Sequence, residues 1–125
     1  MFKNTKAFNS FSVDNLEKAK EFYSKILGLE ISDSSMGTLE MTINGGNKVL
    51  IYPKPDHQPA SFIILNFPVD NIDKAVDKLT ASGVKFEKYE GKLKTDEKGI
   101  FRKEGPNIAW FKDPAGNILS VIETT

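Results

Sequence analysis

Hydrophobic and polar residues follow a pattern that occurs twice along the chain. In each copy an alternating stretch typical of a strand precedes apolar residues at helical spacing, and further short strands follow. The first copy predicts a strand over 6–13, an amphipathic helix from Leu16 to a stop at Gly28, and strands over 29–34, 38–43 and 48–52. A tight turn at 44–46, Asn-Gly-Gly, joins the last two strands.

The second copy predicts the same order of elements. A strand over 61–69 leads into a helix over 72–81 that stops at Gly83, and a strand over 84–90 comes next. The charge-rich stretch 91–105 is expected to be a solvated loop that pairs in part around 100–103. Strands over 107–112 and 118–123 end the copy, joined by the turn Asp113-Pro-Ala-Gly-Asn117.

One string of nine residues marks the repeat most directly. Phe11-Ser-Val-Asp-Asn-Leu-Glu-Lys-Ala19 returns as Phe67-Pro-Val-Asp-Asn-Ile-Asp-Lys-Ala75, and each Asp-Asn pair supplies the chemistry of a helix N-cap. We therefore expect a single domain over 1–125, with modules 1–53 and 60–125 joined by a proline-rich connector over 53–59. Because each copy needs the other to cover its apolar face, we expect the functional site in the cleft between them.

Composition excludes several classes of function. The 17 basic and 17 acidic residues cancel, which argues against nucleic acid as a partner. The absence of cysteine excludes disulfides, thiolate metal sites and cysteine nucleophiles. The sequence shows neither a signal peptide nor eighteen consecutive apolar residues, so we expect a cytoplasmic protein with no membrane partner.

Three motifs together resemble the vicinal oxygen chelate superfamily, which includes glyoxalase I, bleomycin-resistance proteins, fosfomycin-resistance enzymes and extradiol dioxygenases. They are the strand ending at Val13 before Asp14-Asn15-Leu16, the helix Glu21-Phe-Tyr-Ser-Lys-Ile-Leu-Gly-Leu29, and the turn Asp113-Pro-Ala-Gly-Asn-Ile-Leu119. The resemblance covers essentially the whole chain. It implies an α+β fold in which two tandem β-α-β-β-β modules, with one helix each, form a curved, barrel-like mixed-sheet cup. It also implies a homodimer, and a cup that usually holds a divalent metal.

The metal ligands that the resemblance implies are missing from this sequence. A His or Gln five positions before the Val of each repeat would fall on Phe8 and Ile64, and the last Glu would fall on Ser120. The remaining ligand belongs in 49–52, which holds neither a carboxylate nor an imidazole. A shifted alignment would offer Glu123 as one ligand. We therefore expect no metal and no cofactor, because a catalytic metal needs about three protein donors.

Seven residues are candidates for contact with a small organic ligand, and no catalytic residue is assigned. Trp110 would stack on a planar ligand, Arg102 would clamp an anion, and Asn66 would supply an amide from a strand. The remaining candidates are Phe8, Tyr52, Ile64 and Ser120. For each of them, packing in the core or contact with solvent is the alternative. The only histidine, His57, is expected to be a solvated connector residue, with contact to a ligand at the rim as its alternative.

Three functions remain open from the sequence. The leading hypothesis is a metal-free binding protein that resembles the bleomycin-resistance branch and holds a small organic molecule in the cup. The second is a superfamily enzyme, of lyase or dioxygenase type, with a displaced or non-standard site. The third is an interaction or structural dimer whose cup is filled by its own side chains.

Overall fold

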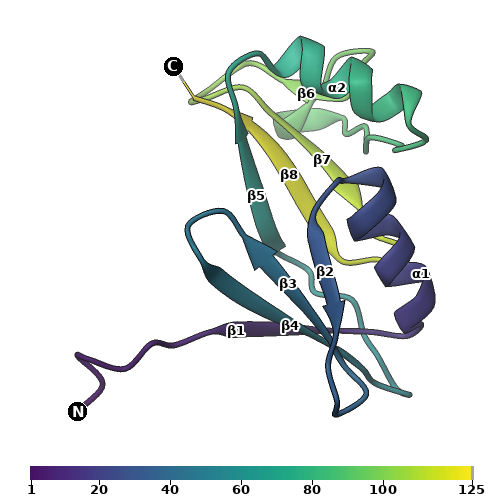
Figure 1. The fold of residues 1–125 in the computed structure, drawn as a ribbon. Coiled ribbons are helices and arrows are strands. Elements are labelled where there is room, and N and C mark those ends of the chain that lie inside the picture. Colours follow the sequence, from purple (N-terminus) through teal and green to yellow (C-terminus); the bar gives the residue numbers. More distant parts are fainter. Residues whose placement is uncertain (125) are drawn as a thin grey trace. The chain divides into compact units, whose positions relative to one another are not determined.

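The computed structural model describes residues 1–124 and divides into two compact units, one ending at Gln58 and the other beginning at Pro59. Each unit contains one four-stranded mixed sheet and one α-helix (Figure 1). The α+β class and the two tandem modules with one helix each are therefore confirmed. None of the helices within residues 1–124 combines the length and the apolar character needed to cross a membrane.

The first unit follows the predicted β-α-β-β-β order. Its strands are β1 (Asn9–Val13), β2 (Glu30–Asp33), β3 (Leu39–Ile43) and β4 (Asn47–Pro53), and its helical segment is α1 (Leu16–Glu21) continued by the π-helix η1 (Phe22–Ile26). The strands lie in the order β1-β4-β3-β2, with β1 parallel to β4 and the other pairs antiparallel. Figure 1 shows β4 between β1 and β3.

The ends of these elements follow from local chemistry. The Asn15 side chain accepts a hydrogen bond from the N–H of Lys18 at 3.0 Å, which caps α1 as predicted. Gly28 takes a φ of 74° after the helical segment, a conformation that favours glycine. The predicted strand over 6–13 begins only at Asn9, where its parallel pairing with β4 starts opposite Val49.

The second unit repeats this topology. Its strands are β5 (Ile63–Val69), β6 (Ile100–Phe101), β7 (Ile108–Lys112) and β8 (Ile118–Glu123), and its helices are α2 (Ile72–Ala81) and the short 3-10 helix η2 (Gly91–Leu93). The order β5-β8-β7-β6 matches β1-β4-β3-β2 strand for strand. The Asn71 side chain caps α2 by accepting from the N–H of Lys74 at 3.0 Å, as Asn15 caps α1.

The predicted strand over 84–90 is wrong. Only Phe86 forms an isolated antiparallel bridge, to Phe111 of β7, and the N–H of Glu87 donates to the carbonyl of Trp110 at 2.8 Å. The chain then leaves the sheet and returns at Ile100, which pairs with Ala109 of the same strand. The edge position that β2 fills without a break in the first unit is therefore filled by two separate pieces in the second.

The core of each unit lies between its sheet and its helix. In the second unit α2 contacts β7 and β8, and its Ile72 and Val76 are fully buried. The strand residues on that side of the sheet are buried as well: Leu65, Ala109, Phe111, Leu119 and Val121. In the first unit the corresponding buried side chains are Phe11, Val13, Leu39, Met41, Val49 and Ile51, with Ala19, Phe22 and Tyr23 of the helical segment.

Candidate ligand-binding face of the second sheet

One face of the second sheet is left uncovered by α2, and we call it the open face. Successive residues of a strand point to opposite faces, so the neighbours of the buried core residues lie here. The register places Asn66 of β5 opposite Ser120 of β8, and Ser120 opposite Trp110 of β7. Three of the seven candidate residues therefore form one row across the sheet.

Ser120 fixes the orientation of the Asn66 side chain. Ser120 is completely buried, and its hydroxyl donates a hydrogen bond to the Oδ1 of Asn66. Asn66 itself is exposed. With Oδ1 engaged, the Nδ2 group has no partner among residues 1–124 and is available as a donor.

Trp110 lies among other aromatic side chains on the open face. Its ring centroid is 5.6 Å from that of Tyr89, at an interplanar angle of 70°, and 6.0 Å from that of Phe101. These contacts hold the indole in one position while leaving it partly exposed. Its Nε1–H group has no hydrogen-bond partner within the described chain. The face thus offers a fixed aromatic surface and two unused donors.

Comparison with protein families identifies the fold family. The family model described as the Glyoxalase/Bleomycin resistance protein/Dioxygenase superfamily matches residues 8–121. The chain belongs to this superfamily. Both the resemblance drawn from the motifs and the two-module fold are thereby confirmed. No curated protein matches the sequence.

Several solved structures resemble this chain over nearly its full length. TnmS3, an antibiotic binding protein from Streptomyces sp. CB03234, is 21% identical, with a TM-score of 0.69 and 98% of each chain covered. The fosfomycin resistance protein FosX from Listeria monocytogenes is 17% identical, with a TM-score of 0.70, 98% of this chain and 94% of that chain covered. A putative glyoxalase family protein from Bacillus anthracis is 17% identical with a TM-score of 0.70, and both chains are covered in full. At this identity the likeness shows the fold alone.

The positions that the superfamily resemblance gives to metal ligands do not fit a divalent cation. Phe8 and Ile64 carry only hydrocarbon, and the Ser120 hydroxyl is already bonded to Asn66. Within either unit of residues 1–124, no three His, Cys, Asp or Glu side chains gather closely enough to hold a metal ion. Glu123 is the ligand that a shifted alignment would offer. It lies on the α2 side of β8. Its carboxylate oxygens accept from the N–H of Ile72 and the side-chain amide of Asn107.

The other candidate residues lie in different surroundings. Phe8 precedes β1 and is 68% exposed, so it fills no core within its unit. Tyr52 of β4 is half-buried in the first unit, opposite Ser12 of β1. Ile64 lies in the second unit at a break in the β5–β8 register, between the paired residues Ile63 and Leu65. Whether any of them contacts a ligand stays a prediction, as does a ligand site in a cup.

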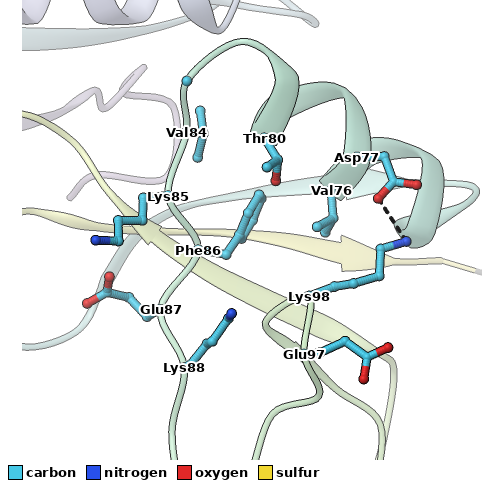
Figure 2. Close-up of a pocket in the computed structure, with 11 residues that line it drawn as sticks. Val76, Asp77, Thr80, Val84, Lys85, Phe86, Glu87, Lys88, Glu97 and Lys98 are labelled. Atoms are coloured by element: carbon cyan, nitrogen blue, oxygen red, sulfur yellow. Dashed lines mark ion pairs between the residues drawn. The ribbon is translucent and has the colours of Figure 1, made fainter.

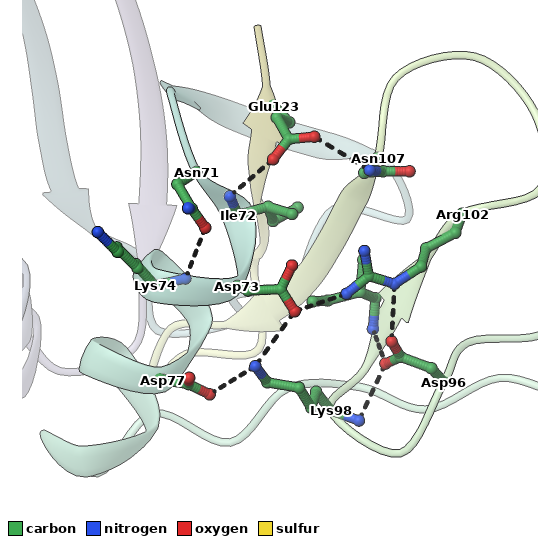
Figure 3. A network of polar contacts seen from close by, with 11 residues as sticks. Asn71, Ile72, Asp73, Lys74, Asp77, Asp96, Lys98, Arg102, Asn107 and Glu123 are labelled. Carbon is green, nitrogen blue, oxygen red and sulfur yellow. Dashed lines mark hydrogen bonds and ion pairs between the residues drawn. The ribbon is translucent and has the colours of Figure 1, made fainter.

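Arg102 has partners that the sequence did not indicate. Its Nη2 donates to Asp73 of α2 at 2.7 Å, and its Nε donates to Asp96 at 2.9 Å (Figure 3). The hydrogen bond to Asp96 and then that to Asp73 raise the pKa of Arg102, while the Arg102 and Lys98 hydrogen bonds hold the pKa of Asp73 below its ordinary value. Arg102 therefore joins the edge of the sheet to α2, on the side opposite Trp110.

His57 is more than a solvated connector residue. Its ring is half-buried, and its Nδ1 lies 2.6 Å from the hydroxyl of Ser12 in β1. The hydrogen bond ties the proline-rich connector back to the first strand of its own unit. The sequence prediction for His57 was wrong because the two residues are 45 positions apart.

Two residues of the open face were missed by sequence reasoning. Tyr89 lies in the misassigned strand over 84–90, and Phe101 lies in the stretch expected to be mostly solvated loop. The available signal was Phe101 itself, an apolar residue beside Ile100 inside a charged stretch. Both now complete the surroundings of Trp110.

Proposed function

We propose that this protein binds a small planar organic ligand on the open face of its second sheet, without a metal of its own. The fixed, partly exposed indole of Trp110 is the observation that carries the proposal. Membership of the superfamily supports the proposal. A second support is that TnmS3, which shares the fold, is an antibiotic binding protein.

The donors on the face define the class of ligand. Asn66 and Trp110 lie two strands apart, a span of about 10 Å at the usual strand spacing. Both present N–H groups, so a matching ligand carries oxygen or nitrogen acceptors at its edges. A fused-ring compound with carbonyl groups fulfils both conditions, and Ser120 acts as a positioning residue that keeps the Asn66 amide turned outward.

Intrinsic fluorescence tests the proposal directly, because Trp110 is the only tryptophan. Riboflavin, a planar compound with ring carbonyls, is expected to quench the emission in a saturable manner, after correction with N-acetyltryptophanamide for absorbance. The planar cation 9-aminoacridine, which lacks carbonyls, is expected to bind at least fivefold more weakly. Quenching no stronger than that of free N-acetyltryptophanamide, at every concentration, would show that the face is not a binding site.

Matched variants separate recognition from folding. Asn66→Ala removes one donor, and Ser120→Ala releases the amide from its fixed orientation, so each is expected to weaken riboflavin binding at least threefold. Ser32→Ala removes an exposed hydroxyl of β2 in the other unit and is expected to leave binding unchanged. Equal affinity in all three variants would contradict the roles given to Asn66 and Ser120.

A further inference from the structure

A groove lies beside α2 and contains none of the residues of the open-face row. It is a groove of about 640 Å³, with the second half of α2 along one side and segment 83–88 along the other (Figure 2). Glu97 and Lys98 form its end. Its volume falls in the range of about 300–1,000 Å³ that is typical of small-molecule sites.

The groove exists because the edge strand of the second sheet is split. The chain leaves β7 after Glu87, makes its excursion, and is brought back against α2 by ion pairs. Lys98 pairs with Asp77 at 2.8 Å and with Asp73 at 3.2 Å, and Arg102 pairs with Asp73 (Figure 3). The end of the groove is thus built by specific contacts.

The floor of the groove is apolar. Val76, Val84 and Phe86 line it, and all three are buried. The Phe86 ring also packs edge-on against Phe111 of β7, with 5.5 Å between centroids, so the floor is continuous with the core. A hydrocarbon group is the matching occupant for such a surface.

The charges on the rim favour an anion. Asp77 is paired with Lys98, which also pairs with Asp73, and Glu87 is paired with Lys112 at 3.3 Å. The ammonium groups of Lys85 and Lys88, by contrast, have no ion-pair partner among residues 1–124. Figure 2 shows Lys88 extending toward Phe86, while the carboxylate of Glu97 points away from it.

The direction of α2 orients the ligand. The helix ends at Ala81, near Gly83, where the negative end of its dipole disfavours a carboxylate. The anionic group therefore belongs at the other end, by Lys88, with the tail along Val84. Lysine offers a point charge, and no arginine and no helix N-terminus is among the lining residues, which favours a single carboxylate over a phosphate.

We propose that this groove is a second binding site, which takes a small organic carboxylate with an apolar tail. It is independent of the ligand proposed for the open face, because the two sites share no residue. Either site can therefore be absent without affecting the other.

The test uses sodium octanoate and the full chain labelled with nitrogen-15. Two-dimensional NMR is expected to show saturable shifts of the amides of 84–88, with the Trp110 indole signal unmoved. Octylamine, with the same tail and the opposite charge, is expected to bind at least tenfold more weakly. Shifts centred on Trp110, equal binding of octylamine, or no saturable shift at all would each overturn the proposal.

Charge variants locate the carboxylate. Lys88→Gln is expected to weaken octanoate binding at least fivefold, whereas Lys92→Gln, which changes an exposed lysine of η2 outside the groove, is expected to leave it unchanged. Both variants retain the ion pairs of Lys98 and Arg102, so both are expected to fold. Equal affinities of the two variants for octanoate would also overturn the proposal.

Discussion

The helix caps Asn15 and Asn71 are contacts that could be predicted from the sequence alone. Each caps a helix by accepting from the N–H three positions ahead, at 3.0 Å in both modules. The hydrogen bond is local, so the sequence alone specifies both partners. Ser12 and His57, or Arg102 and Asp73, are joined over long separations and depend on how the chain folds. For this reason the roles of His57 and Arg102 could not be predicted.

The ion pairs of Asp73 predict a dependence of stability on pH. The hydrogen bonds from Arg102 and Lys98 lower the pKa of this carboxyl below 3.8 in the folded protein. Their contribution is therefore complete above about pH 4 and is lost as the pH falls through the lowered folded value. Asp73→Asn is expected to reduce the free energy of unfolding at neutral pH, and the difference from wild type is expected to shrink in acid.

Urea unfolding of the wild type and of Asp73→Asn, from about pH 7 to about pH 3, measures this dependence. The double variant with Arg102→Gln completes a cycle that isolates the pair from other effects of each substitution. Because the side chains of Asp73 and Arg102 are 47% and 40% exposed, the coupling is expected to be small and to decline with added salt. A difference between wild type and Asp73→Asn that does not change with pH would refute the assignment.

Elements with signals at both ends were predicted best. The helix α2 begins and ends at the predicted residues, because a cap precedes its apolar period and Gly83 follows it. Strand β8 also has its predicted bounds. The strand over 84–90 failed although Val84 and Phe86 do alternate on a buried side. The alternation does not show that β7 changes partner between Phe111 and Ala109, because Ile100 and not a residue of 84–90 pairs with Ala109.

Gly99 is expected to be essential at this junction, and Gly91 provides the control. Both have positive φ, 92° and 79°, so alanine costs about 1–2 kcal/mol at either position through backbone strain. A Cβ at Gly99 would also lie 2.8 Å from the Cβ of Phe86, whereas nothing lies within 4 Å of one at Gly91. Gly99→Ala should therefore cost roughly 1–3 kcal/mol more than Gly91→Ala.

Urea unfolding of the two variants measures this difference in stability. The NMR amide signals of 84–88 report whether this segment at the edge of the second sheet is displaced. Only Gly99→Ala is expected to shift these signals. If both variants lose the same stability, the close approach to Phe86 is not a constraint on the fold.

For the whole molecule, the internal repeat was the most informative signal. It predicted two modules, and the two sheets do share one strand order. The fold was therefore available from the sequence, and the matching family model shows the family membership. The residues of the proposed open-face site were predicted only in part. Asn66, Ser120 and Trp110 were three of the seven candidates because they lie on strands whose alternation is visible in the sequence, whereas Tyr89 and Phe101 lie beside the irregular excursion.

We also propose that the protein forms a homodimer. Each sheet is small and ends in strands that pair on one side only within their unit, and such edges favour association between copies. Light scattering after gel filtration is expected to give twice the chain mass of 13.9 kDa. A mass of one chain across the whole range of concentrations would refute the proposal.

The split edge of the second sheet also matters for protein engineering. Two modules with one strand order differ at this position, because the second accommodates an excursion where the first has the uninterrupted β2. The short 3-10 helix Gly91–Leu93 lies within this excursion and has no buried residue. A peptide epitope or a reporter domain grafted there would extend a detour that the module already contains, without interrupting a paired strand.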